Sequence, residues 1–148
     1  MSDMMRKLPI GIQDFEKIRI GNYIYVDKTK YIYNLVHNIA PYFLSRPRRF
    51  GKSLFLSTLR AYWEGKKELF KGLDIEDLEK ENPDAWQEYP VFYFDFNRDG
   101  FSEKDALEKI LEEHLTEWEN RYELNQKQLP QPERFRHIIK TAYEKTGK

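Results

Sequence analysis

The sequence contains no cysteine, which excludes disulfide bonds, thiolate metal sites and cysteine nucleophiles. Its three histidines, His37, His114 and His137, do not have the spacing of zinc ligands, so a structural zinc site is not expected. No stretch approaches the roughly 20 consecutive apolar residues that a membrane helix needs. The first residues also lack the apolar run of a signal peptide. We therefore expect a cytoplasmic protein that makes no membrane contact.

The sequence also lacks a net charge, because its 25 basic and 25 acidic residues cancel. A global basic field that would capture nucleic acid is therefore absent, although local basic patches remain open. Aromatic residues, in contrast, are abundant: ten Tyr, ten Phe and three Trp make up 16% of the chain. Disordered chains are poor in such residues, so we expect a packed core. A length of 148 residues suits one compact domain or a large part of a bigger protein.

The apolar pattern predicts strands that alternate with helices. Short β-branched or aromatic runs predict strands over residues 22–26, 41–45 and 90–96. Helical apolar spacing predicts helices near residues 14–18, after Asp27, over 54–63, in short pieces between 66 and 89, from Ser102 to about Tyr122, and after Pro132. Such alternation is typical of an α/β protein, here a parallel sheet flanked by helices. Because the chain stops after a helix, where another strand would be due, the sheet is expected to be cut short.

A basic loop, Arg46-Pro-Arg-Arg-Phe-Gly-Lys-Ser53, lies between a predicted strand and a predicted helix. Phosphate-binding loops occupy the same place and follow the pattern G-x-x-x-x-G-K-[ST], whose last three positions match Gly51, Lys52 and Ser53. The glycine lets the backbone approach the phosphates, and the N–H groups of the helix start supply donors and partial positive charge. Lys52 is expected to reach the β- and γ-phosphates of ATP, and the Ser53 hydroxyl to bind Mg²⁺.

Two positions of this loop depart from the pattern. Arg46 stands where the first glycine is expected, which indicates a different loop path, and Pro47 removes one backbone donor. A Gly-Lys-Ser tripeptide alone is common, so an alternative stays open: a solvated basic turn, or a patch that touches nucleic acid backbone. The flanking apolar elements favour nucleotide binding, because they hold four cations around the start of a helix, where a polyphosphate fits.

Five segments of the sequence carry a family resemblance. They are Leu8-Pro-Ile-Gly-Ile-Gln-Asp-Phe15, Tyr25-Val-Asp-Lys-Thr29, Tyr42-Phe-Leu-Ser-Arg-Pro-Arg-Arg-Phe-Gly-Lys-Ser53, Glu68-Leu-Phe-Lys-Gly-Leu73 and Tyr89-Pro-Val-Phe-Tyr-Phe-Asp-Phe96. Through them the chain resembles, over nearly its whole length, the amino-terminal part of the AAA-ATPase-like family of uncharacterised, mostly bacterial proteins. The run Ser-Arg-Pro-Arg-Arg-Phe-Gly-Lys-Ser is specific to this family, so Arg46 is the family's own variant of the loop.

The resemblance implies a P-loop NTPase-like sheet, truncated before the Walker B strand, that binds ATP and Mg²⁺. It implies a lead-in strand and helix over residues 1–40 and a P-loop core over residues 41–148. Arg48 and Arg49 are expected to be auxiliary phosphate ligands, and Ser53 the magnesium ligand. The implied nucleotide-binding residues are Arg48, Arg49, Phe50, Gly51, Lys52, Ser53 and Leu54. In this family a nuclease-like domain of the PD-(D/E)XK type often follows, which makes nucleic acid an indirect partner.

The acidic residues that complete such a site are missing from the sequence. In the family a later strand ends in an Asp-Glu pair, which would begin shortly after Lys148, so ATP hydrolysis would need residues beyond that point. Asp95 ends a predicted strand, and two interpretations stay open: a contact to the shell around magnesium, or a bond to nearby backbone or to an arginine. We therefore expect an ATP-binding module that is a poor hydrolase by itself.

Two other functions stay open. In a nucleic-acid-associated module, Arg46, Arg48 and Arg49 would grip backbone phosphates, and the affinity would fall steeply with salt. In a protein-interaction domain with a vestigial loop, nucleotide would have no effect, and exposed apolar surface would allow self-association.

Two further groups of residues have structural interpretations. Asp27 is expected to cap the helix that follows it, and a nucleotide-base contact by the Asp27-Lys-Thr29 segment is the alternative. Four glutamates have the spacing of an exposed helix face, namely Glu112, Glu113, Glu117 and Glu119.

Overall fold

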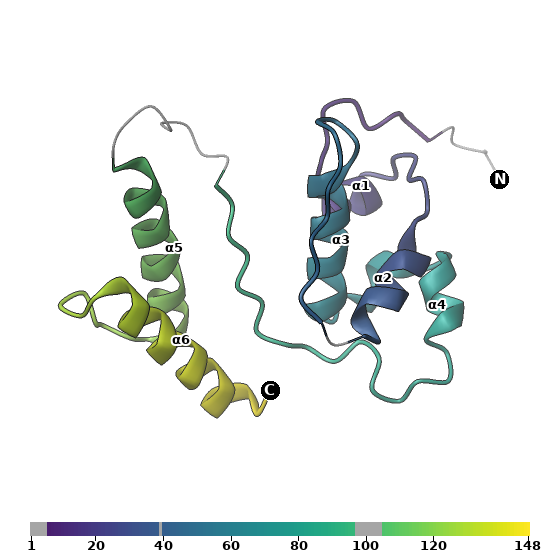
Figure 1. Ribbon diagram of the computed structural model, residues 1–148. Coiled ribbons are helices and arrows are strands. Elements are labelled where there is room, and N and C mark those ends of the chain that lie inside the picture. The colour runs from purple at the N-terminus through teal and green to yellow at the C-terminus, as the bar shows by residue number, and fades with distance from the viewer. Residues whose placement is uncertain (1–5, 39, 97–104) are drawn as a thin grey trace. The chain divides into compact units, whose positions relative to one another are not determined.

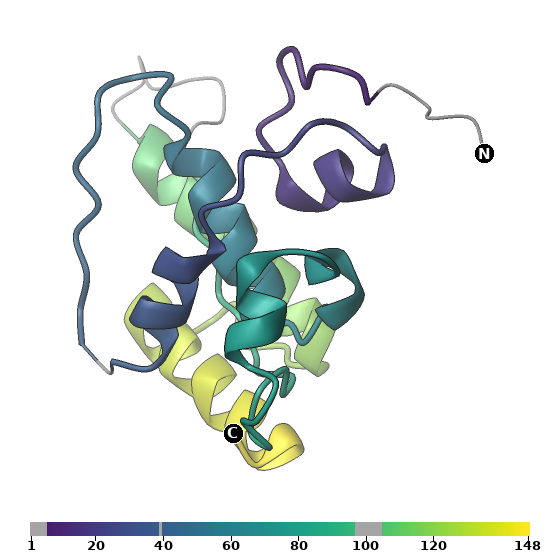
Figure 2. The ribbon, with the colours of Figure 1, turned by 90° about the vertical axis from the view of Figure 1, so that its right-hand side faces the viewer.

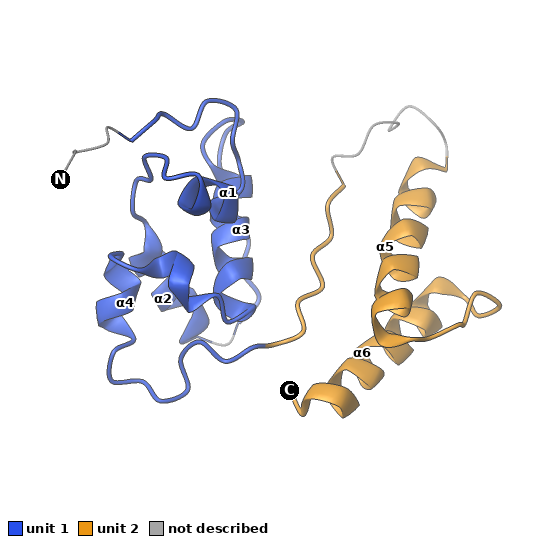
Figure 3. Ribbon diagram, turned by 180° about the vertical axis from the view of Figure 1, so that it is seen from behind, with its two compact units in different colours: residues 1–88 blue, residues 89–148 orange. Residues whose placement is uncertain are grey.

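The computed structural model describes residues 6–38, 40–96 and 105–148, in which helices are the regular elements (Figure 1). The chain divides into two compact units, residues 1–88 and residues 89–148 (Figure 3). The first unit contains α1 (Phe15–Ile20), α2 (Thr29–Val36), α3 (Lys52–Trp63), the 3₁₀-helix η1 (Lys67–Phe70) and α4 (Asp74–Leu78). The second contains α5 (Ala106–Tyr122) and α6 (Gln131–Thr146). The predicted helices are thereby confirmed, while the predicted cap at Ser102 lies outside the described residues.

The predicted parallel sheet is wrong, because the described residues form helices and no strand. The α/β class, a P-loop NTPase-like sheet flanked by helices, is therefore not the architecture of this chain. One isolated bridge, between Lys7 and Tyr23, is the only β-type pairing in residues 6–38, 40–96 and 105–148. The three runs with a strand pattern, residues 22–26, 41–45 and 90–96, belong to no β-ladder.

Aromatic packing explains the course of residues 90–96. The Phe92 ring lies 5.1 Å, centroid to centroid, from Trp118 on α5, and the Phe94 ring lies 4.8 Å from the same tryptophan. Both phenylalanines also contact Phe135 on α6. The apolar side chains of this segment are thus covered by helices of their own unit and not by neighbouring strands. A short apolar run does not distinguish these two environments, because its periodicity carries no information about the partner.

The other two runs lack the partners that a strand needs. Residues 41–45 have the apolar composition of a buried strand, but Phe43 in this run is 93% exposed. The Ile24 amide donates to the Lys7 carbonyl at 2.9 Å, but the pairing does not extend into a ladder. Since an isolated pair of extended segments is marginal in water even with a full ladder, neither run becomes a strand.

The core of the first unit fixes the position of α3. The Phe15 ring of α1 is fully buried and lies 4.9 Å from the Phe70 ring of η1. The Phe15 amide donates to Ser57 Oγ of α3 at 2.9 Å. The carboxylate of Asp14 caps α1, because it accepts from the Lys17 amide at 2.9 Å. The buried core residues are Phe15, Ile32, Ala61, Tyr62, Leu69, Phe70, Leu73 and Ile75.

Asp27 joins the first turns of two helices. Its Oδ1 accepts from the Thr29 amide at 2.8 Å and from the Thr29 hydroxyl at 2.7 Å, so it bonds the first amide of α2, although the N-cap residue of that helix is Lys28 and not the predicted Asp27. Its Oδ2 accepts from the Asp74 amide at 2.7 Å, at the start of α4. The Thr29 hydroxyl oxygen in turn accepts from the Ile75 amide at 3.1 Å. With both carboxylate oxygens bonded inside the unit, Asp27 holds α2 against α4, and a contact to a nucleotide base is not supported.

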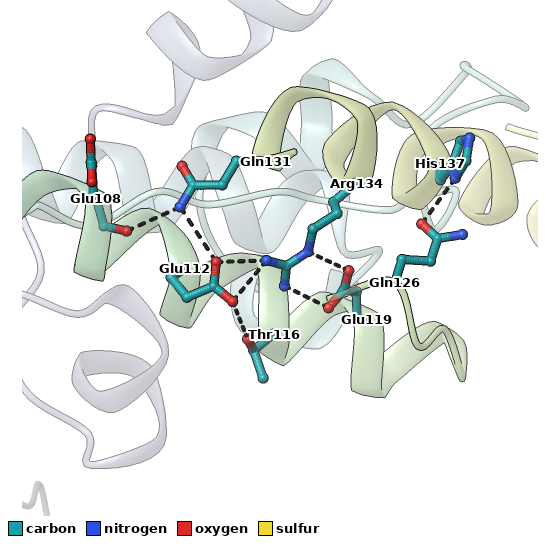
Figure 4. A network of polar contacts seen from close by, with 8 residues as sticks. All are labelled: Glu108, Glu112, Thr116, Glu119, Gln126, Gln131, Arg134 and His137. Atoms are coloured by element: carbon teal, nitrogen blue, oxygen red, sulfur yellow. Dashed lines mark hydrogen bonds and ion pairs between the residues drawn. The ribbon is translucent and has the colours of Figure 1, made fainter. Parts of the chain in front are cut away.

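Arg134 of α6 is the buried polar centre of the second unit (Figure 4). Its Nε and Nη2 donate to the two carboxylate oxygens of Glu119, each at 2.7 Å, and its Nη1 donates to Glu112 at 2.6 Å. Glu119 is only 2% exposed because it faces Arg134 across the α5–α6 contact, so the predicted exposed face is wrong for this residue. A buried bidentate pair has one favourable geometry, and it therefore sets the register of α5 against α6.

We expect Arg134→Met to lower the free energy of unfolding by about 3–5 kcal/mol, because it leaves the Glu119 carboxylate buried without its partner. The double variant Arg134→Met with Glu119→Leu should recover most of this loss, since two apolar side chains replace the ion pair. Urea unfolding followed by tryptophan fluorescence measures both effects. Equal destabilisation in the single and double variants would contradict the assigned role of the pair.

The Arg134–Glu112 contact predicts a dependence of stability on pH. Hydrogen bonds from Arg134 hold the pKa of Glu112 below its ordinary value. The pKa of a glutamate in the unfolded chain is about 4.3, and a lower pKa in the folded protein stabilises the fold at pH values above it. This stabilisation is lost as the pH falls through the folded-state pKa. The stability difference between the wild type and Glu112→Gln should therefore be largest near neutral pH and shrink below about pH 4. Urea unfolding of both proteins near neutral pH and below about pH 4 tests this. A stability difference that stays constant between the two conditions would show that the Arg134–Glu112 pair does not form.

Candidate functional site

Residues 46–51 of the basic loop form the last part of the irregular segment between α2 and α3, and Lys52 and Ser53 begin α3 (Figure 2). Gly51 is the N-cap of α3 and has φ 77° and ψ 24°, in the left-handed region. Glycine adopts this conformation at little cost, whereas a side chain strains it. A Cβ on Gly51 would meet nothing within 4 Å, so the backbone conformation, and not crowding, requires glycine at this position.

The first turn of α3 presents backbone donors that the described chain does not use. The first helical bond runs from the Phe55 amide to the Gly51 carbonyl at 2.9 Å. No side chain caps the helix, and the amides of Lys52, Ser53 and Leu54 donate to no group within the described stretches. Unused amides and the helix dipole together favour an anion at this helix start.

Three cationic side chains accompany these amides. Arg48, Arg49 and Lys52 are exposed, and their side chains form no hydrogen bond or ion pair with any residue that the structure describes. The backbone of Arg49 has φ 67°, in the left-handed region, which costs a non-glycine residue roughly 1–2 kcal/mol. The Phe50 side chain beside it is 63% exposed. The loop therefore carries positive charge that no carboxylate of the described chain neutralises.

Arg46 behaves differently from the other cations of the loop. Its Nη1 donates to the Phe50 carbonyl at 3.4 Å, and its guanidinium carbon lies 5.9 Å from the centre of the Phe55 ring. Because a trans peptide directs its C=O and N–H to opposite sides, a Phe50 carbonyl held toward Arg46 turns the Gly51 amide away from it. Arg46 thus braces the loop from the position where the phosphate-loop pattern has glycine, and the sequence pattern did not predict this contact.

Ser53 is the residue of the loop suited to hold magnesium. It is half-buried in the first turn of α3, and its hydroxyl makes no hydrogen bond within the described part of the chain. Magnesium that bridges nucleotide phosphates takes one or two protein oxygens and keeps several waters, so a single hydroxyl fits this donor set.

Asp95 belongs to the second unit, where its backbone lies beside His114. The His114 Nε2 is 3.2 Å from both the amide nitrogen and the carbonyl oxygen of Asp95. A role for Asp95 in the shell around magnesium stays a prediction.

Glu79 is a buried carboxylate that the sequence pattern did not single out. It accepts hydrogen bonds from the Tyr62 hydroxyl at 2.7 Å and from Asn82 Nδ2 at 2.7 Å, and it lies 2.9 Å from His37 Nε2. Two of these partners are 42 and 17 positions away in the sequence, so no local motif reveals the cluster. All of its recorded partners belong to the first unit's own packing, and we assign it to stability.

The loop geometry described above defines a class of site: a cationic, glycine-containing loop that opens a helix and suits a bound anion. The chain belongs to the AAA-ATPase-like family, described as predicted AAA-ATPases, whose pattern it matches over residues 9–148. The resemblance of the sequence to this family is thereby confirmed. The segments that carry the resemblance include the whole basic loop.

One relative is an uncharacterised protein encoded in the vnfD 5′ region of Azotobacter chroococcum mcd 1. It is 41% identical over 143 residues, which cover 96% of this chain but 27% of the relative. The chain thus spans about a quarter of that protein's length. No solved structure matches the sequence. In residues 6–38, 40–96 and 105–148, none of the helices combines the length and the apolar character required to cross a membrane.

The brace formed by Arg46 can be tested by proteolysis. We expect Arg46→Met to speed tryptic cleavage after Arg48 and Arg49 up to about fivefold, because the loop loses an exposed hydrogen bond and a cation–π contact that together contribute about 1 kcal/mol. Trypsin does not cut before proline, so residue 46 adds no cleavage site in either protein. Phe55→Leu should give a smaller increase. Unchanged cleavage in both variants would show that Arg46 does not hold the loop.

Proposed function

We propose that this chain is a nucleotide-binding module that holds the phosphates of ATP, with Mg²⁺, at the start of α3. The observation that carries the proposal is the first turn of α3, which follows the left-handed Gly51 and has no side-chain cap; its first amides and the three cations Arg48, Arg49 and Lys52 bond to no group in the described parts of the chain. Membership of a family of predicted ATPases supports the choice of nucleotide over other anions.

Each residue of the loop has a separate task in this proposal. The Gly51, Lys52, Ser53 and Leu54 amides donate to phosphate oxygens, in the way that helix starts bind phosphate. Lys52 places its ammonium on the β- and γ-phosphates, and the Ser53 hydroxyl is the protein ligand of Mg²⁺. Arg48 and Arg49 offer planar guanidinium groups for further phosphate oxygens.

We propose binding rather than efficient hydrolysis for the residues present. Hydrolysis requires a group that orients the attacking water, and acidic residues that help to hold the metal. No recorded contact brings a carboxylate to the basic loop within the described stretches. Where such a module is joined to another domain, nucleotide binding in the cytoplasm would drive a change in that domain, for which a nuclease-like domain is our candidate.

The first test is calorimetric titration of the 148-residue chain with Mg-ATP. We expect the wild type to bind and Lys52→Ala to bind at least about tenfold more weakly, because one charge-assisted hydrogen bond contributes about 1.5–3 kcal/mol. ADP should bind more weakly than ATP, since Lys52 then loses the γ-phosphate.

The matched control is Lys80→Ala, which removes an exposed lysine of the same unit whose side chain bonds to none of the described residues. This variant should bind Mg-ATP like the wild type. Equal affinities of the wild type and Lys52→Ala would refute the proposal. Binding that ignores the γ-phosphate but falls steeply with salt would instead favour nucleic acid backbone as the ligand.

A further inference from the structure

A groove of about 530 Å³ lies in the second unit, between residues 89–92 and one side of α6. The basic loop belongs to the first unit and contributes nothing to it. Helix α6 lines the groove with Arg136, Ile139, Lys140 and Tyr143. Residues spaced by three and four positions lie along one side of a helix, so these four side chains form a continuous stripe.

The surface of this groove is mostly apolar. Pro90, Phe92 and Ala142 contribute to its lining, and Phe92 and Ala142 connect it to the packed interior of the unit. Ile139 is 45% exposed and Tyr143 is 62% exposed, so both leave apolar surface in contact with water. Apolar side chains placed together in a concave surface favour a partner that covers them.

The charged residues of the groove are all cations. Arg136 is exposed and makes no ion pair with any described residue. Lys148 holds its Nζ 5.1 Å from the centre of the Tyr89 ring. Lys140 lies 3.8 Å from Glu144, but both side chains are largely exposed, and such a pair contributes little. Since no acidic side chain is among the described residues that line the groove, the complementary ligand is an anion that also carries apolar groups.

We propose that this groove is the docking site for an acidic, amphipathic peptide segment of a partner protein. Apolar side chains of the peptide cover Ile139 and Tyr143, and its carboxylates pair with Arg136 and Lys140. A single nucleic acid strand fits less well. Its bases need exposed ring faces, but the Phe92 ring packs against Trp118 and the Lys148 ammonium lies over Tyr89, which leaves Tyr143 among the rings that line the groove. This site is independent of nucleotide binding by the basic loop.

Fluorescence anisotropy with labelled peptides tests the proposal on the whole chain. The probe is a short peptide in which Glu alternates with Leu, compared with one peptide that has Gln for Glu and one that has Ala for Leu. We expect the Glu–Leu peptide to bind at least about tenfold more tightly than either. An excess of oligothymidylate should not displace it.

Variants of the chain locate the binding site. Arg136→Glu and Tyr143→Ser should each weaken binding of the Glu–Leu peptide about tenfold. Lys127→Glu, which makes the same charge change at an exposed residue outside the groove, should have little effect. Thermal unfolding of each variant verifies that it is folded. The proposal is overturned if the wild type does not bind this peptide, if Gln–Leu binds equally well, if Arg136→Glu and Lys127→Glu act alike, or if oligothymidylate displaces the peptide.

Discussion

Backbone N–H groups at helix starts are the constraint on which the first unit depends. The first amides of a helix have no intrahelical acceptor, so another group must bond to them. Asp14 supplies this acceptor to α1, and Asp27 supplies it to both α2 and α4. Helix α3 begins without any side-chain cap. Carboxylates thus bond to the first amides of α1, α2 and α4, while the start of α3, beside the cations of the basic loop, has no carboxylate from the described residues. A carboxylate at that position would repel a phosphate.

The second unit depends on the orientation of α6, which buries Arg134 together with Ile138 and Ala142 and leaves Ile139 and Tyr143 exposed. Arg134 is buried against α5, where two glutamates compensate the cost of removing its charge from water. Ile139 and Tyr143 lie exposed beside the groove. Ile138 and Ala142 are buried, as on the core side of an ordinary surface helix, so Ile139 and Tyr143 form a second apolar side that the unit leaves exposed. The ion pair is specific enough to hold α6 in this orientation, and the exposed stripe is then available to a partner.

The helices could be predicted from the sequence, because the spacing of apolar residues such as Leu59 and Tyr62 reports which side of a helix is buried. The absence of a sheet from the described residues could not be predicted. Residues 90–96 have a strand-like apolar pattern, but Trp118 and Phe135 cover them, and an apolar pattern does not specify which element packs against it. The motif placed Gly51 and Lys52 correctly at the start of a helix. The contact from Arg46 to the Phe50 carbonyl depends on the loop path, which the pattern does not specify.

The conformation of the basic loop has a cost that binding of an anion can offset. Arg49 adopts the left-handed region at φ 67°, and Arg48 and Lys52 hold like charges near it without a neutralising carboxylate in the described chain. Strained, unsatisfied segments persist where the surrounding structure holds them, and they concentrate at binding sites. Here Arg46 and the packing of α3 are the holding elements. A polyphosphate would relieve the repulsion and fill the open amides together, so the loop loses little conformational entropy on binding and gains contacts that are already oriented.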